Sequence, residues 1–212
     1  MPGNPQNFSF HLRRYITSDI FDLVPFEPSS DFWSNTEKVV LTIHGWNSSS
    51  GRFSTFSALE NEKTKVFALD WRKESTSLNY LKNFQNGRLV ARQVAKFLRS
   101  ALSAGVKAEN IHLIGHSMGA HVASFIAKEI QNDNLKIGRV TGLDPAGPFF
   151  ENCNKGARLD MSDADLVDII HTNPGQLPSQ GIDIPIGHFD YFIGKNTRIR
   201  WGRNFSKIYR KI

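Results

Sequence analysis

The sequence predicts an α/β fold with a mostly parallel central sheet and helices on both of its faces. Short apolar runs typical of buried strands alternate with longer segments of helical spacing, which is the pattern of strands joined by crossover helices. Chemically active side chains are then expected at the carboxyl edge of the sheet. The predicted strands are residues 39–44, 66–69, 111–114, 139–143, 166–171 and 188–192.

Two helices are predicted from the spacing of apolar residues by three and four positions. The first covers residues 88–102, and Gly105 stands where a C-terminal stop is expected. The second begins after Ser117 and continues to Ile130. Strand 111–114 and this helix therefore flank a short turn that holds Ser117.

That turn fits the Gly-x-Ser-x-Gly pattern of a nucleophile elbow, with Gly115, Ser117 and Gly119 at its fixed positions. A serine at the tip of a strand-to-helix turn has a strained backbone, so its neighbours two positions away must lack bulk. The first free N–H groups of the helix, starting with Met118, point toward charge that develops on a carbonyl oxygen. The motif predicts Ser117 as the nucleophile of an acyl-transfer reaction.

Asp144 is the candidate carboxylate that would orient a general base. It follows strand 139–143, stands 27 residues after Ser117, and precedes Pro145, which stiffens the turn. An aspartate in such a turn commonly caps the turn. Its place after the next strand of the series favours the catalytic interpretation.

Composition indicates one globular domain with a basic tail. Seven of the 26 basic residues and no acidic residue lie in residues 193–212, which leaves 19 basic against 20 acidic in residues 1–192. The charge of residues 1–192 gives no reason to expect a nucleic-acid partner. The tail is either a solvated segment or a contact with an anionic lipid surface.

The compartment is indicated by two features. Cys153 is the only cysteine, so no intrachain disulfide points to an oxidising compartment. Residues 1–14 lack the apolar core of a signal peptide, so the chain is expected to be cytoplasmic if it is complete.

Residues 8–192 resemble the catalytic domain of the pancreatic-lipase-like family, which includes lipoprotein lipases, insect lipases and vespid-type phospholipases A1. The resemblance rests on His44-Gly45-Trp46, on 68–71, on the elbow and on 141–148. It implies an α/β-hydrolase fold, Ser117 as nucleophile, Asp144 as acid, and the N–H groups of Trp46 and Met118 as oxyanion hole. It also implies acylglycerol or phospholipid substrates, no required cofactor, and an extracellular location.

The chain departs from this family after Phe192. There the family has its catalytic histidine in a cysteine-flanked loop, whereas residues 193–212 contain neither residue type. The resemblance thus implies a fold that lacks its C-terminal part. Five histidines match family positions that are not the base, and two are isolated histidines with no such match: His44, His116, His121, His171 and His188 in the first group, and His11 and His112 in the second. Three interpretations stay open: a lipid esterase whose coding sequence is truncated or diverges after Phe192, a catalytically inactive lipid-binding protein with a lipase fold, or a basic-tailed protein directed to anionic surfaces.

A further resemblance concerns metal binding. Residues 158–163 are similar to the loop that binds a structural calcium ion in pancreatic-type lipases, which would assign Asp160 and Asp163 as ligands. Lys155 stands where the pancreatic enzymes have an acidic residue.

Overall fold

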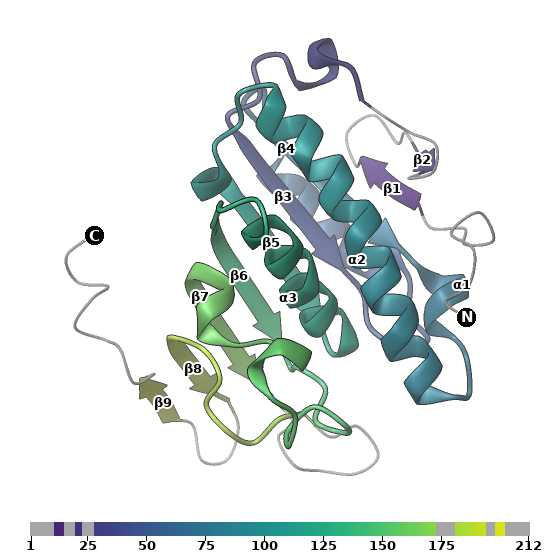
Figure 1. The fold of residues 1–212 in the computed structure, drawn as a ribbon, viewed down its shortest axis with the longest axis vertical. Coiled ribbons are helices and arrows are strands. Elements are labelled where there is room, and N and C mark those ends of the chain that lie inside the picture. Colours follow the sequence, from purple (N-terminus) through teal and green to yellow (C-terminus); the bar gives the residue numbers. More distant parts are fainter. Residues whose placement is uncertain (1–10, 15–19, 23–27, 173–180, 194–197, 202–212) are drawn as a thin grey trace.

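The fold is described from a computed structural model, which covers residues 11–14, 20–22, 28–172, 181–193 and 198–201. The described strands form one sheet in the order β2-β1-β4-β3-β5-β6-β7-β8-β9 (Figure 1). The six strands from β4 to β8 in this order are parallel, and β1, β2 and β9 extend the two ends in antiparallel orientation. The strands are β1 His11–Arg14, β2 Ile20–Asp22, β3 Lys38–Ile43, β4 Thr64–Asp70, β5 Ile111–His116, β6 Ile137–Leu143, β7 Ala164–His171, β8 Phe189–Phe192 and β9 Arg198–Trp201.

The predicted α/β class and all six predicted strands are confirmed. The α-helices are α1 Arg72–Ser75, α2 Tyr80–Ser103 and α3 Met118–Gln131. Short 3-10 helices occupy several connections: η2 Ser30–Trp33, η3 Ser50–Leu59, η4 Ala108–Asn110, η5 Lys155–Ala157 and η6 Met161–Asp163. None of the described helices has the length and apolar character needed to cross a bilayer.

Helix α2 starts eight residues before the predicted start. The apolar spacing missed these first turns because their buried positions hold polar residues. The Asn79 side chain accepts a hydrogen bond from the Lys82 N–H and caps the helix. Asn83 and Asn86 are buried, and their amides donate to the carbonyl oxygens of Ser77 and Glu74, each at 2.8 Å. The turn between α1 and α2 is therefore held by side chains that no apolar periodicity would detect. The predicted stop is confirmed, since α2 ends at Ser103 and Gly105 has a φ of 99°.

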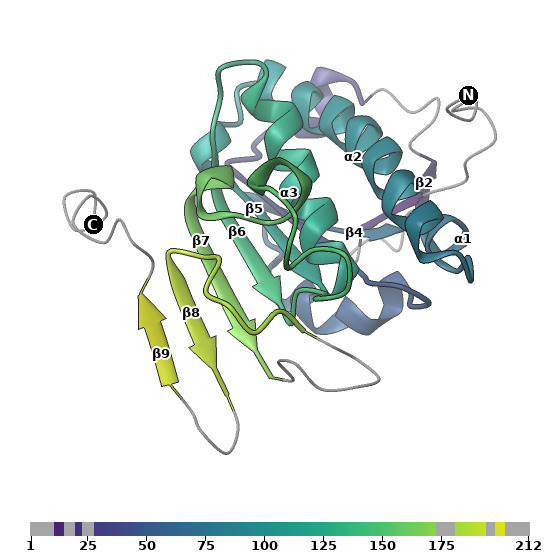
Figure 2. The same ribbon diagram turned by 60° about the horizontal axis from the view of Figure 1, so that its bottom comes forward.

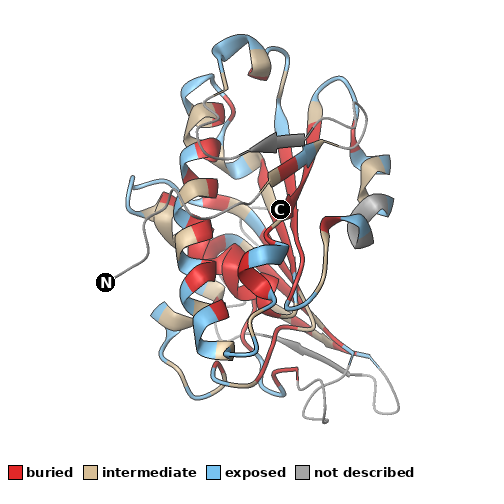
Figure 3. Ribbon diagram, turned by 90° about the vertical axis from the view of Figure 1, so that its right-hand side faces the viewer, coloured by how far each residue is buried: buried red, intermediate tan, exposed pale blue. Residues whose placement is uncertain are grey.

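The two faces of the sheet are covered differently. Helices α2 and α3 pack together on one face, over a core that includes Leu41, Leu113 and Val140. The other face carries a smaller cluster of Val40, Val66 and Ile114, and η3 lies over it through Phe56. Figure 3 shows the buried strands between the long helices and η3. Helical elements thus flank both faces as predicted, but both long helices lie on one.

Part of the basic tail, which the sequence predicted to be either a solvated segment or a lipid contact, forms strand β9. Arg198–Trp201 pairs antiparallel with β8, and Tyr191 lies opposite Ile199 (Figure 2). The reason is that β8 would otherwise leave a row of unpaired backbone groups, which a strand can satisfy whatever the charge of its side chains. The other residues of the tail, 194–197 and 202–212, lie outside the described residues.

The strand register brings the predicted site residues to one edge. Ile43 pairs with Gly115, and Gly115 pairs with Gly142, so β3, β5 and β6 end at the same level. The segments that follow these strands hold Trp46, Ser117 and Asp144. This carboxyl edge of the sheet is where the predicted chemistry has to be assembled.

Candidate active site

Ser117 has the backbone conformation that the elbow motif predicts. It joins β5 to α3 with φ 54° and ψ −123°, a region that residues with side chains rarely adopt. Its N–H donates to the Leu143 carbonyl oxygen at 2.9 Å, which fixes the elbow to the end of β6. Met118 is the first residue of α3, so its N–H has no acceptor within the helix.

Gly119 and Gly45 allow three segments to meet at Ser117. A Cβ atom at Gly119 would lie 2.3 Å from the Ile43 carbonyl oxygen, and one at Gly45 would lie 2.9 Å from the Ser117 Cβ. Gly115 is equally confined, since its Cβ would lie 2.3 Å from the Gly119 carbonyl oxygen. These contacts hold the loop after β3 against the start of α3.

Replacement of Gly119 by alanine is expected to lower the free energy of unfolding by about 2–3 kcal/mol, because the new methyl group meets backbone atoms that cannot move aside. Alanine is the better helix former by about 1 kcal/mol, so any loss reports the clash. Urea unfolding measures the effect. Gly51→Ala is the matched control, because its Cβ would have only Ser49 Oγ at 3.9 Å. Equal stability of the two variants would contradict the packing.

The loop that holds Trp46 is fixed by His44, which is buried. The Trp71 N–H donates to His44 Nε2 at 3.1 Å, which assigns the ring proton to Nδ1, and the Asp70 carboxylate lies 3.6 Å from Nε2. That Nδ1–H donates to the Gly45 carbonyl oxygen at 2.9 Å, and the Trp71 indole N–H donates to the His44 carbonyl oxygen at 2.8 Å. His44 and Trp71 therefore orient the backbone next to Trp46. Apart from the family resemblance of the two segments, no sequence pattern indicated this arrangement.

Asp144 follows β6 in a left-handed conformation with φ 48°. Its carboxylate accepts hydrogen bonds from the Thr172 N–H, at 2.9 Å, and from the Thr172 hydroxyl group. Its own N–H donates to the Ile170 carbonyl oxygen at 2.7 Å. The carboxylate is thus anchored to the end of β7, and Thr172 is a site residue that sequence reasoning missed.

Two histidines near the elbow, His112 in β5 and His121 in α3, have structural roles. His121 lies one turn beyond Ser117 and donates through Nε2 to the Ala146 carbonyl oxygen at 2.8 Å, while its Nδ1 accepts from the Leu159 N–H. Burial lowers the pKa of His121 to about 3. His112 bonds Thr141 Oγ1 at 2.8 Å, and burial lowers its pKa to about 4. His121 thereby ties α3 to the loop that follows Asp144.

The remaining histidines are also directed elsewhere. His171 is fully buried between the Ile182 carbonyl oxygen and the Asp190 carboxylate. His188 Nδ1 accepts a hydrogen bond from the Val167 N–H at 2.9 Å. His116 alternates onto the η3 face of β5, and His11 lies in β1, opposite Asp70.

Acid is expected to destabilise the fold through His121. The pKa of His121 is near 6.5 in the unfolded chain and about 3 in the folded chain. Its contribution to the free energy of unfolding is therefore fully present above about pH 6.5 and is lost as the pH falls toward 3. The expected loss is roughly 2 kcal/mol at about pH 5, to which His112 adds. Urea unfolding at both pH values measures it. His121→Gln should show a shallower pH dependence, and an unchanged slope would contradict the assignment.

A lysine ammonium group lies beside each of the two carboxylates that were predicted to bind calcium. Lys128 Nζ lies 2.5 Å from Asp163 Oδ1, 2.6 Å from Ser124 Oγ and 3.0 Å from the Arg158 carbonyl oxygen. Burial lowers the pKa of Lys128, and the Asp163 carboxylate opposes that shift. Lys155 Nζ lies 3.5 Å from Asp160 Oδ2. Among the described residues no group of three metal-binding side chains forms. The lysine contacts of Asp163 and Asp160 therefore argue against a calcium ion in the loop around η6, and the calcium assignment stays a prediction.

Chelation of divalent ions is accordingly expected to leave the Tm of the chain unchanged. Lys128→Met should lower the free energy of unfolding by about 3 kcal/mol, because it leaves the Asp163 carboxylate buried without its cation. Differential scanning calorimetry with and without a chelator measures both effects. Lys136→Met is the control, since Lys136 and Asp165 are exposed and 3.9 Å apart. A fall in Tm of many degrees on chelation would contradict this interpretation.

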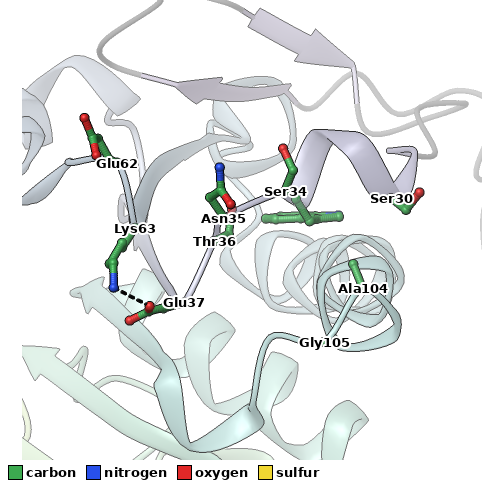
Figure 4. Close-up of a pocket in the computed structure, with 10 residues that line it drawn as sticks. Ser30, Ser34, Asn35, Thr36, Glu37, Glu62, Lys63, Ala104 and Gly105 are labelled. Carbon is green, nitrogen blue, oxygen red and sulfur yellow. Dashed lines mark hydrogen bonds and ion pairs between the residues drawn. The ribbon is translucent and has the colours of Figure 1, made fainter.

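A hollow of about 680 Å³ lies away from these groups (Figure 4). Its lining includes Glu37, Lys63 and Gly105, and a hydrogen bond of 2.7 Å joins Lys63 Nζ to the Glu37 carboxylate. Glu37 and Lys63 immediately precede β3 and β4, which places the hollow at the amino edge of the sheet. The elbow, its neighbouring loop and Asp144 lie at the opposite edge.

A strained serine between a parallel strand and a helix, at the carboxyl edge of such a sheet, defines the chain as an α/β-hydrolase fold. A bacterial phospholipase/carboxylesterase from Dyadobacter fermentans has a similar fold, with a TM-score of 0.51 and 12% sequence identity over 82% of this chain and 77% of that one.

The sequence comparisons define the family. The family model named Lipase matches residues 16–201, so the chain belongs to the lipase family. Hepatic triacylglycerol lipase of Oryctolagus cuniculus is 36% identical over 82% of this chain. Pancreatic lipase-related protein 2 of Homo sapiens is 42% identical over 63%, and phospholipase A1 member A of Bos taurus is 36% identical over 79%. The chain spans 36%, 28% and 37% of the lengths of these three relatives. The resemblance inferred from the motifs is thereby confirmed.

Proposed function

We propose that this chain provides the nucleophile, oxyanion hole and acid of a lipid ester hydrolase. The observation that carries the proposal is the strained backbone of Ser117 at the carboxyl edge, with the loop of Gly45 packed directly against it. Ser117 is the nucleophile, and the N–H groups of Trp46 and Met118 bind the developing oxyanion. Asp144 is the acid.

The reaction follows from these positions. Ser117 Oγ attacks the ester carbonyl carbon and loses its proton to a base, the carbonyl oxygen becomes an oxyanion, and the ester C–O bond then breaks to release the alcohol with a proton. Water cleaves the resulting acyl-serine in the same manner. Asp144, held by Thr172, has the role of orienting an imidazole and stabilising its charged form.

The substrate class rests on the family and on the character of the site edge. Two of the similar proteins are named as a triacylglycerol lipase and a phospholipase A1. Trp46 and Phe149, which are both exposed, give this edge an apolar surface suited to acyl chains. We therefore propose acylglycerols or phospholipids as substrates, and an extracellular location like that implied by the family.

A second function is favoured by the histidines. His44, His112, His121, His171 and His188 each make hydrogen bonds away from Ser117, which supports the interpretation that none of these five acts as its base. An inactive lipid-binding protein would keep the same fold and the same apolar edge.

Release of fatty acid from a phospholipid and a triacylglycerol, with and without added imidazole, tests the proposal. We expect slow hydrolysis that free imidazole accelerates, because the small base can enter the space where a histidine side chain is absent. Ser117→Ala should abolish the imidazole-dependent part, and Ser124→Ala is the control serine in α3. Hydrolysis that is independent of Ser117 would refute the esterase assignment. Lipid binding without any hydrolysis would favour the second function.

A further inference from the structure

The turn between α1 and α2 exposes more apolar surface than the fold requires. In the α1–α2 turn, defined here as residues 76–82, Leu78 is 97% exposed and Leu81 is 54% exposed. Single exposed leucines are common on soluble proteins. Here the helix cap and the buried Asn83 hold the turn in place, so both leucines are presented to solvent by an ordered backbone.

The exposed leucines continue into a row of aromatic rings. Tyr80 stands between them in sequence, and its ring lies 6.4 Å from that of Trp46 and 5.4 Å from that of Phe149. Trp46 and Phe149 are exposed and come from the loops after β3 and β6. The apolar surface therefore extends from the α1–α2 turn to the loop beside Ser117.

The charges around the turn are positive. Arg72, Lys73 and Lys82 are exposed, and Glu74, the single acidic residue of 71–88, is buried. Arg72 is partly offset by the Asp70 carboxylate at 3.3 Å. The acidic residues Glu151 and Asp183 follow the Phe149 end of the row, away from the turn in sequence. Apolar side chains flanked by exposed cations are complementary to an anionic lipid surface.

The opposite edge of the sheet provides a contrast. Leu135 is 41% exposed between α3 and β6, where Asp133 and Lys136 pair with Arg99 and Asp165. No described aromatic ring contact involves that segment. Leu135 is thus an isolated exposed leucine in a segment of balanced charge, and it serves as the matched control.

We propose that the α1–α2 turn docks the chain on an anionic lipid surface, with Leu78 and Leu81 in the acyl layer and Lys73 and Lys82 among the headgroups. Docking in this orientation brings Trp46 and the Ser117 edge against the lipid. The choice of a lipid rather than a protein partner rests on the proposed function. The binding itself needs no hydrolysis, so the two can fail separately.

Cosedimentation of the full chain with vesicles of non-hydrolysable ether lipids tests the proposal. Phosphatidylcholine vesicles are compared with vesicles that also contain phosphatidylglycerol. We expect binding to the anionic vesicles, roughly tenfold weaker in Leu78→Asp and weaker again in Leu78→Asp/Leu81→Asp. Lys73→Gln and Lys82→Gln should each weaken it roughly fivefold. Leu135→Asp should bind like the unchanged chain.

Several outcomes would overturn the proposal. Binding that is equal in Leu78→Asp and the unchanged chain would place the contact elsewhere, for example on the basic segment 193–212. Self-association that Leu78→Asp abolishes in analytical ultracentrifugation would identify a second copy as the partner. We expect the Leu78 variants to be folded because Leu78 is exposed, and near-ultraviolet circular dichroism checks this. Vesicle binding that depends on Leu78, without any ester hydrolysis, would support the docking proposal and refute the proposed esterase. Hydrolysis of soluble esters without such binding would support the esterase and refute the docking proposal.

Discussion

An organophosphonate probe is expected to label Ser117 about 10⁴-fold or more slowly than it labels a complete Ser-His-Asp enzyme, because removal of one triad member costs about that much. The strained elbow is present in this chain, but the proposed centre is expected to have no imidazole that removes the Ser117 proton. Intact-protein mass spectrometry over time measures the rate, and peptide mapping locates the adduct.

The control for this experiment is Ser117→Ala, which should remove the adduct. Rapid stoichiometric labelling of Ser117 in the unchanged chain would contradict the expectation and would imply that one of the seven histidines acts as a base. His121→Gln and His171→Gln would then identify it. If labelling in both variants is as fast as in the unchanged chain, neither His121 nor His171 is the base, and both keep their structural roles.

Asp190→Ala is expected to lower the free energy of unfolding by about 3–5 kcal/mol, the cost of removing one partner of a buried pair. The Asp190 carboxylate is fully buried and accepts from His171 Nε2 at 2.9 Å and from the N–H groups of Ile186 and Gly187. Alanine would leave all three donors without an acceptor. Urea unfolding at neutral pH measures the loss.

The matched control is Asp165→Ala, in the neighbouring strand β7. Asp165 is exposed and lies 3.9 Å from Lys136, so its loss should cost less than about 1 kcal/mol. Similar losses in the two variants would show that the buried pair contributes no more than a surface pair. His171 immediately precedes Thr172, which binds Asp144, so Asp190→Ala is also expected to disturb the acid position.

The central strands could be predicted because their apolar runs are continuous. Strands such as β3 and β5 are buried on both faces, which gives an unambiguous pattern, and the glycine spacing identified the elbow. The start of α2 could not be predicted, because Asn83 and Asn86 are buried there through hydrogen bonds to the backbone of a distant turn. Periodicity reports apolar burial and misses polar burial.

Contacts between distant segments account for the other differences. The metal prediction relied on Asp160 and Asp163, and the sequence did not reveal that Lys128, from α3, lies beside Asp163. Thr172 was not predicted as the anchor of Asp144 because the two residues become neighbours only when β6 and β7 pair. The aromatic contact of Tyr80 with Trp46 and Phe149 also joins the start of α2 to two loops far apart in sequence.

The order of the strands separates the proposed reaction centre from the margin of the sheet, after which the family resemblance places the proton acceptor. Strands β3, β5 and β6, which precede Trp46, Ser117 and Asp144, are adjacent in the interior of the sheet, whereas β8 and β9 lie at its margin. Changes at the margin can therefore alter proton transfer while the elbow keeps its shape. In such an architecture the proposed centre can lose turnover through a change at the margin while the proposed lipid-binding turn, which lies elsewhere in the sequence, is unaffected.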